Sequence, residues 1–160
     1  MSAWLVCRHA AWIAVAVFAS LAPQVQAVEI AVAPVVDQTG LPVLGEQWLP
    51  LNPYRGNSRA IEVGKSAFNQ ACAKCHGSDA LQSVNNGAIA PDLRRLNRYC
   101  RRIADEALQK TCLTDNDRYF VKTVKQGKVV VGIVHMPAWD KVLSQELVWA
   151  IQAFIESQAK

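Results

Sequence analysis

Apolar residues recur at helical spacing in two stretches that lie far apart in the chain. Gly64, Phe68 and Cys72 follow one another at intervals of four, so a helix over 58–74 carries them on one face. Near the C-terminus, Ser144 is placed to cap a helix whose apolar residues fall within one arc. These residues are Leu147, Val148, Ala150, Ile151, Phe154 and Ile155. Glycine inside a helix costs about 1 kcal/mol relative to alanine, so we expect Gly64 to face a close crossing with the last helix.

The remaining pattern adds one helix and one ambiguous segment. A helix capped by Thr114 or Asp115 is predicted to run to Gln126, because Gly127 favours termination there. Segment 128–134 is β-branched without an obvious partner strand. We expect extended backbone there, with a two-stranded pairing as the alternative. Segment 77–90 is rich in turn-forming residues and is predicted to be a loop. Because the regular elements predicted with the clearest patterns are helices, we expect an all-α fold.

The first 27 residues have the features of a cleaved secretory signal peptide. A short polar region containing Arg8 precedes the apolar run 10–22, and Val25 and Ala27 are small residues at the expected cleavage site. The apolar run is shorter than the about 20 residues that a membrane-spanning helix needs. An uncleaved membrane anchor is the alternative.

Segment 28–57 is predicted to be an extended arm. Prolines at positions 34, 42, 50 and 53 exclude a long helix. Trp48 and Tyr54 nevertheless need cover, which favours an arm that packs on the domain formed by 58–160. Trp149 lies on the side of the last helix opposite its apolar arc, and we expect the arm to cover it. The alternative is a disordered tail.

Charge and cysteine content narrow the function. The formal net charge is +4, with 17 Lys and Arg against 13 Asp and Glu, which is too small for a nucleic-acid-binding footprint. Cys7 leaves with the signal peptide. Cys100 and Cys112 remain as a pair in an oxidising compartment, where a disulfide is expected, with two unpaired thiols as the alternative.

The stretch 93–112 is basic. Its arginines are Arg94, Arg95, Arg98, Arg101 and Arg102. Such a cluster is typical of a solvated face. Neutralisation of the carboxylates of a bound cofactor and contact with an acidic partner are the other interpretations.

Chemistry is concentrated in Cys72-Ala73-Lys74-Cys75-His76. This is the C-x-x-C-H signature of covalent haem c attachment, in which Cys72 and Cys75 form thioethers and His76 is an axial ligand of the iron. A zinc site needs a second ligand pair nearby, and a thioredoxin-like dithiol needs a βαβ context. Two buried, inert cysteines are the remaining alternative.

A second axial ligand is expected near the other end of the domain. Met136 is the only methionine after the predicted cleavage site, and a thioether is a soft iron ligand that raises the reduction potential. His135 is the rival ligand, and an open position is the third possibility. Trp139 is expected to cover the haem edge, and Phe68 to pack beside the haem.

Pro91 is a candidate to orient the proximal histidine. Proline has no backbone N–H but keeps its carbonyl. That carbonyl can accept a hydrogen bond from Nδ1 of His76, which leaves Nε2 for iron. A proline that merely begins the next helix is the other interpretation.

Together these residues resemble class I cytochromes c over about 58–158. The resemblance rests on Gly64 and Phe68 before the haem motif, on Ala90-Pro91-Asp92-Leu93, on Met136-Pro137 and on Phe154. It implies helices wrapped around one covalently bound haem.

Further segments are similar to small periplasmic cytochromes that accept electrons from PQQ-dependent alcohol dehydrogenases. They are Asn52-Pro53-Tyr54-Arg55-Gly56-Asn57, the Cys100/Cys112 pair, Asp117-x-Tyr119-Phe120 and the start of the last helix. The resemblance implies a monomeric, periplasmic electron carrier that is not an enzyme, with a quinoprotein dehydrogenase as donor and another cytochrome or an oxidase as acceptor. The alternatives are a haem enzyme or gas sensor with an open distal site, a membrane-tethered subunit, and a carrier serving a different dehydrogenase.

Overall fold

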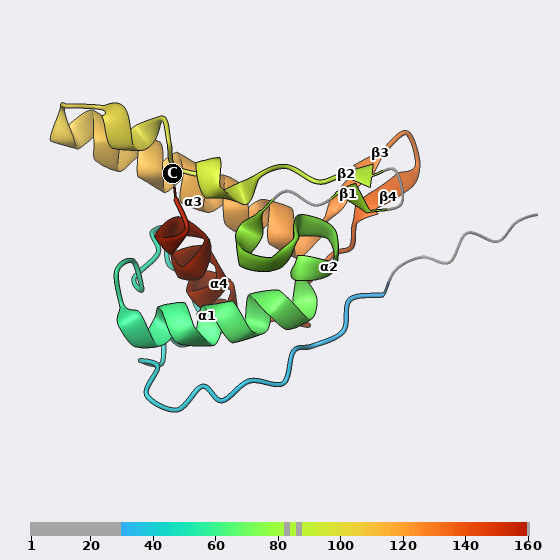
Figure 1. Cartoon of the computed structure of the whole chain (residues 1–160). Helices are drawn as coiled ribbons and strands as arrows, with labels where there is room; N and C mark the ends of the chain where they lie inside the picture. The colour runs from blue at the N-terminus through green and yellow to red at the C-terminus, as the bar shows by residue number, and fades with distance from the viewer. Residues whose placement is uncertain (1–29, 82–83, 86–87, 160) are drawn as a thin grey trace, which may run out of the picture.

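A computed structural model describes residues 30–81, 84–85 and 88–159 of the chain (Figure 1). The predicted signal peptide, 1–27, lies outside the described residues. The α-helices are α1 (Ser58–Ala71), α2 (Ala73–His76), α3 (Glu106–Gln126) and α4 (Gln145–Ser157). Short 3-10 helices are η1 (Ser78–Ala80), η2 (Leu93–Arg95) and η3 (Cys100–Arg102), and the strands are β1 (Val84–Asn85), β2 (Ala88–Ile89), β3 (Lys128–Val130) and β4 (Ile133–Met136). The predicted predominance of helix is confirmed.

The centre of the fold is the crossing of α1 and α4 (Figure 1). A Cβ atom at Gly64 would collide with the backbone carbonyl of Ala150, so only glycine permits this approach. Next to this contact the rings of Phe68 and Phe154 lie 5.3 Å apart, tilted by 54°, a favourable aromatic arrangement. The close crossing predicted from Gly64 is therefore confirmed.

Helix α4 is buried on nearly all sides, although its apolar arc covers only one of them. Residues 147–155 are all buried. The arc packs on α1, and Trp149 on the other side is fully buried with its ring centroid 6.4 Å from that of Trp48. Segment 30–57, which contains no helix or strand, supplies this second cover as expected for Trp149.

Polar side chains of α4 fasten this segment. Glu146 accepts a hydrogen bond from the backbone N–H of Leu44 at 3.0 Å, and the side-chain oxygen of Gln145 accepts one from Leu49 at 2.6 Å. Tyr54 is 1% exposed and donates its hydroxyl hydrogen to the carbonyl of Pro42. These contacts use backbone groups of Pro42, Leu44 and Leu49, so they do not depend on the side chains at these three positions.

A buried carboxylate joins this segment to α3 and α4. Asp117 is 0% exposed and accepts hydrogen bonds from Asn52 N at 2.9 Å, Arg55 Nη2 at 2.8 Å and Gln152 Nε2 at 2.8 Å. Arg55 also binds both carboxylate oxygens of Glu156, each at 2.8 Å. A buried charge with all its partners in place holds three segments in one arrangement.

The predicted start of the third helix was wrong. The cap lies nine or ten residues earlier than expected: the side chain of Asp105 accepts from the N–H of Leu108, and helix α3 begins at Glu106. Thr114, the expected cap, lies inside the helix and donates its hydroxyl hydrogen to the carbonyl of Lys110. The first helix is likewise capped by Asn57 and ends at Ala71.

Two short antiparallel pairs interrupt the helical pattern. β1 pairs with β2 inside the segment predicted to be a loop. β3 pairs with β4, which is the alternative considered for 128–134. Cys100 and Cys112 form a disulfide with an S–S distance of 2.02 Å, which joins η3 to α3.

Candidate functional site

The C-x-x-C-H segment forms one helical turn at the end of α1. The N–H groups of Cys75 and His76 donate to the carbonyl of Cys72 at 3.2 and 3.0 Å. Residues three apart on a helix lie on one face, so the backbone brings the thiols of Cys72 and Cys75 together. Among the described residues a disulfide joins Cys100 to Cys112, and the cysteines of this turn are not part of it.

The acidity of Cys72 argues against a redox-active dithiol. Burial and the neighbouring Cys75 raise the pKa of the Cys72 thiol to about 12. Thioredoxin-type chemistry needs a lowered pKa, because the thiolate is the reactive form. The surroundings of Cys72 therefore raise the thiol pKa, where this chemistry uses surroundings that lower it.

His76 is oriented by the carbonyl that the sequence suggested. Its Nδ1 lies 3.4 Å from the carbonyl oxygen of Pro91, at the long end of hydrogen-bonding distance. Burial lowers the pKa of His76, and the hydrogen bond to Pro91 opposes this only in part. A neutral imidazole whose Nδ1 is engaged presents Nε2 as the free donor atom.

Met136 stands at the end of β4, where the backbone is held close to α3. A Cβ atom at Gly127 would collide with the carbonyl of Met136, and Gly127 has φ +69°. After this contact Trp139 N donates to the carbonyl of Val124 at 3.0 Å. The segment that carries Met136 is thus fixed to the end of α3 by a residue that must be glycine.

His135 and Met136 differ in burial. His135 is exposed, whereas Met136 is half-buried and packs against the apolar core. Lys128 pairs with Met136 and Val129 with Val134, so His135 has no partner in this register. The burial of Met136 favours it over its neighbour as a ligand.

The donor set fits a haem iron better than a zinc ion. Within the described ranges no group of three or more His, Cys, Asp or Glu side chains is placed to hold a metal ion. The imidazole of His76 and the thioether of Met136 match the iron ligands of haem c. The thiols of Cys72 and Cys75, which lie on one helical turn, match its attachment points.

Two residues expected beside a haem lie in the core. Phe68 is 0% exposed and packs on Phe154, and Trp139 is 7% exposed. Their contact with haem stays a prediction.

Most arginines of 93–112 are exposed, and some of them also pair with acidic side chains or a carbonyl. Arg94 forms two hydrogen bonds with Asp92, each at 2.9 Å, and Arg101 donates to the carbonyl of Glu156 at 3.1 Å. Arg95, whose Nε lies 3.9 Å from Asp92, is exposed, as are Arg98, Arg101 and Arg102, which is typical of a solvated face.

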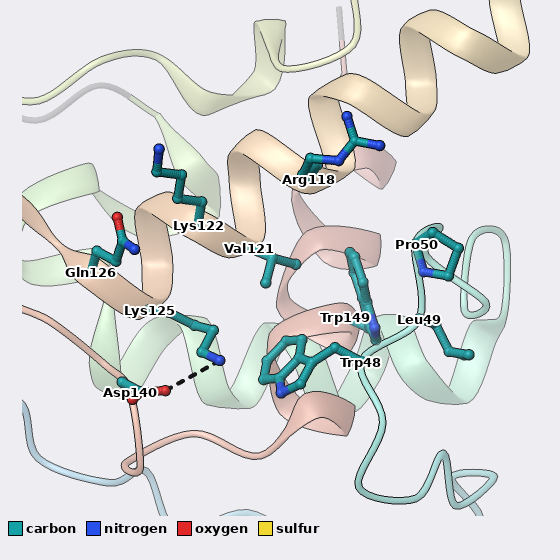
Figure 2. A pocket seen from close by; sticks show the side chains of 10 residues that line it. All are labelled: Trp48, Leu49, Pro50, Arg118, Val121, Lys122, Lys125, Gln126, Asp140 and Trp149. Atoms are coloured by element: carbon teal, nitrogen blue, oxygen red, sulfur yellow. Dashed lines mark ion pairs between the residues drawn. The ribbon is translucent and has the colours of Figure 1, made fainter.

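A groove that the sequence did not indicate lies between 48–50 and α3 (Figure 2). Its volume is about 500 Å³. Lys125 spans it, with Nζ 4.7 Å from the ring centroid of Trp48 and 3.4 Å from Asp140 Oδ1. No pattern in the sequence indicates this groove, because it forms only when the N-terminal segment packs on α3.

Comparisons with known proteins agree on one family. The family described as "Cytochrome C oxidase, cbb3-type, subunit III" matches residues 59–155. Cytochrome c550 of Pseudomonas aeruginosa is 39% identical over 126 residues, which cover 76% of this chain and 74% of that protein. No solved structure matches. Among the described residues no helix is both long and apolar enough to cross a membrane.

Proposed function

The chain belongs to the cytochrome c family and carries covalently bound haem c, and from this premise we propose that it is a periplasmic carrier of single electrons. Its donor is a PQQ-dependent alcohol dehydrogenase, and its acceptor is another cytochrome or an oxidase. The observation that carries the proposal is the donor set: one oriented imidazole and one half-buried thioether, and no cluster of three or more His, Cys, Asp or Glu side chains placed to hold a metal ion among the residues that the structure describes. The donor assignment is supported by the segments that resemble cytochromes of this kind.

In this proposal Cys72 and Cys75 would hold the haem through thioethers, and His76 and Met136 would ligate its iron. Bound haem supplies a one-electron couple at its iron. Pro91 fixes the ring orientation of His76 through Nδ1, and Gly127 fixes the backbone of Met136. Two side chains that both ligate the iron would leave no position for a substrate at the metal, which is why we propose a carrier and not an enzyme.

The ligand assignment is tested with the oxidised holoprotein. The far-red absorption band typical of Met–Fe(III) ligation should be present in the wild type and in His135→Ala and absent in Met136→Leu. Met136→His should lower the reduction potential, because imidazole stabilises Fe(III) relative to a thioether. If Met136→Leu keeps the band, Met136 is not a ligand. If the wild type lacks the band and binds carbon monoxide, the distal site is open and the protein is a haem enzyme or sensor.

The donor assignment is tested by mixing the oxidised cytochrome with a purified PQQ-dependent alcohol dehydrogenase and an alcohol. Reduction of the haem should be fast and should depend on cytochrome concentration. Reduction by ascorbate with none by the dehydrogenase would reject this donor while leaving the electron-carrier role intact. Fractionation of cells that express the full chain tests the periplasmic location.

A further inference from the structure

The hairpin of β3 and β4 exposes an unusual amount of apolar surface. It projects beyond the end of α3 in Figure 1. Five branched aliphatic side chains on it are large and exposed: Val129 at 60%, Val130 at 45%, Val131 at 94%, Ile133 at 54% and Val134 at 41%. Exposed aliphatic residues that adjoin one another, unlike scattered ones, mark contact surfaces.

A haem cannot cover all of this surface. Cross-strand partners lie on the same face of a ribbon and successive residues on opposite faces. Val130 pairs with Ile133, and Val129 pairs with Val134, so each face carries one exposed pair. A planar ring packs against one face only. Whichever face it takes, the other pair and Val131 at the tip remain open.

The tip is also strained. Val131 and Gly132 connect the strands with φ +49° and +76°, the conformation of a two-residue turn in which Asn-Gly is preferred. A β-branched residue with positive φ is a genuine outlier. Valine at this position weakens the hairpin and supplies 94% exposed apolar surface. The combination is expected where the apolar side chain serves a contact that the free protein does not make.

The surroundings of the hairpin define the charge of its partner. From Arg118 to Trp139 the chain has no Asp or Glu but contains Lys122, Lys125 and Lys128. Lys122 and Lys128 are exposed. Lys125 pairs with Asp140, so the exposed Lys122 and Lys128 give this end of the molecule its positive charge. An apolar tip near two exposed lysines complements a protein surface on which an apolar depression is bordered by carboxylates.

We propose that the β3–β4 hairpin is the docking element for the redox partner, inserting Val131 into an apolar depression with an acidic border. This inference rests on the proposed function, because it assumes that an electron-transfer protein is the partner. The hairpin carries Met136, so a partner bound to it lies beside the strand that supplies the proposed axial ligand.

The test exploits the strain. In Val131→Asn the residue suits positive φ, so the holoprotein should be more stable, whereas its apolar contact is lost. We expect a higher Tm, an unchanged far-red band and reduction potential, and a second-order rate of reduction by a PQQ-dependent alcohol dehydrogenase that is lower by about three- to tenfold. Val43→Asn, at a valine that is 88% exposed, is the matched control and should react at the wild-type rate. Lys128→Glu should slow the reaction most at low ionic strength.

The outcomes separate this inference from the proposed function. If the dehydrogenase does not reduce the wild type, the donor assignment fails, and the same variants are compared in the oxidation of the ascorbate-reduced protein by a cytochrome c oxidase. Equal rates for wild type and Val131→Asn in both reactions, or no reaction in either, overturn the docking role. So does an equal loss in Val43→Asn. Val131-dependent binding to vesicles of anionic phospholipid, with unchanged electron-transfer rates, would assign the hairpin to a membrane surface instead.

Discussion

The buried carboxylate of Asp117 should hold the N-terminal segment to the domain, and Asp117→Asn tests this without changing side-chain size. Its oxygens accept from Asn52 N, Arg55 and Gln152, all at 2.8–2.9 Å. An amide has one acceptor oxygen, so its NH₂ group must face at least one of these donors. The least costly orientation leaves the N–H of Asn52 unsatisfied.

The magnitude follows from these contacts. A buried donor without a partner costs about 1–3 kcal/mol. Breaking a buried ion pair by neutralising one member costs up to about 3–5 kcal/mol, but Arg55 is one-third exposed and keeps Glu156, so the lower part of that range applies. We expect Asp117→Asn to lower the free energy of unfolding by about 3 kcal/mol.

Asp115→Asn is the matched control on the same helix. Asp115 pairs with Arg118 at 3.0 Å, and both side chains are more than 60% exposed. Such a pair contributes less than about 0.5 kcal/mol. Guanidinium unfolding of the two holoproteins, followed by far-ultraviolet circular dichroism and haem absorbance, measures the difference. Equal free energies would show that the buried network does not stabilise the fold.

Proteolysis distinguishes what the network holds. If Asp117 fastens the N-terminal segment, cleavage within 30–50 should accelerate in Asp117→Asn at denaturant concentrations that leave the helices folded. A loss of global stability with unchanged cleavage there would mean that the carboxylate acts only between α3 and α4.

Three further variants test the remaining structural arguments on the holoprotein. Gly64→Ala should destabilise it by at least about 1–3 kcal/mol in guanidinium unfolding, because overpacking against Ala150 outweighs the gain in helix propensity; a stabilised variant would contradict the close crossing. Replacing Cys100 and Cys112 by serine should cost about 2–3 kcal/mol in the same assay while the haem spectrum is retained, and no loss of stability would show that the disulfide is dispensable. Gly127→Ala should weaken or abolish the far-red band of Met–Fe(III) ligation by displacing the backbone of Met136; an intact band would mean that the methionine is positioned by other contacts.

Local patterns in the sequence predicted the parts of the fold that local chemistry determines. The spacing of four between Gly64, Phe68 and Cys72 predicted a helix. Gly64 predicted the close crossing, because a glycine inside a helix destabilises it unless a neighbouring backbone needs the space. The position of Trp149 on the wheel predicted that a second element covers α4. The C-x-x-C-H turn predicted its own geometry because its hydrogen bonds join residues three and four apart.

The parts that were missed depend on contacts between distant segments. Asp117 has no local signal, because its donors come from 65 residues earlier and 35 residues later in the chain. The start of α3 was placed too late because Thr114 resembles a cap, although its hydroxyl bonds within the helix and Asp105 is the cap in use.

The choice between His135 and Met136 shows how pairing changes a local argument. Alternation along an extended strand predicts that neighbours point to opposite sides, so that only one of the two reaches the iron. The register shift beside Val129 leaves His135 without a cross-strand partner, and at such an irregularity strict alternation no longer applies. What separates the two residues is the contact of Gly127 with the Met136 carbonyl, which draws Met136 against the core and leaves His135 in solvent. The preference for the thioether therefore depends on a glycine nine residues earlier, at the end of another element.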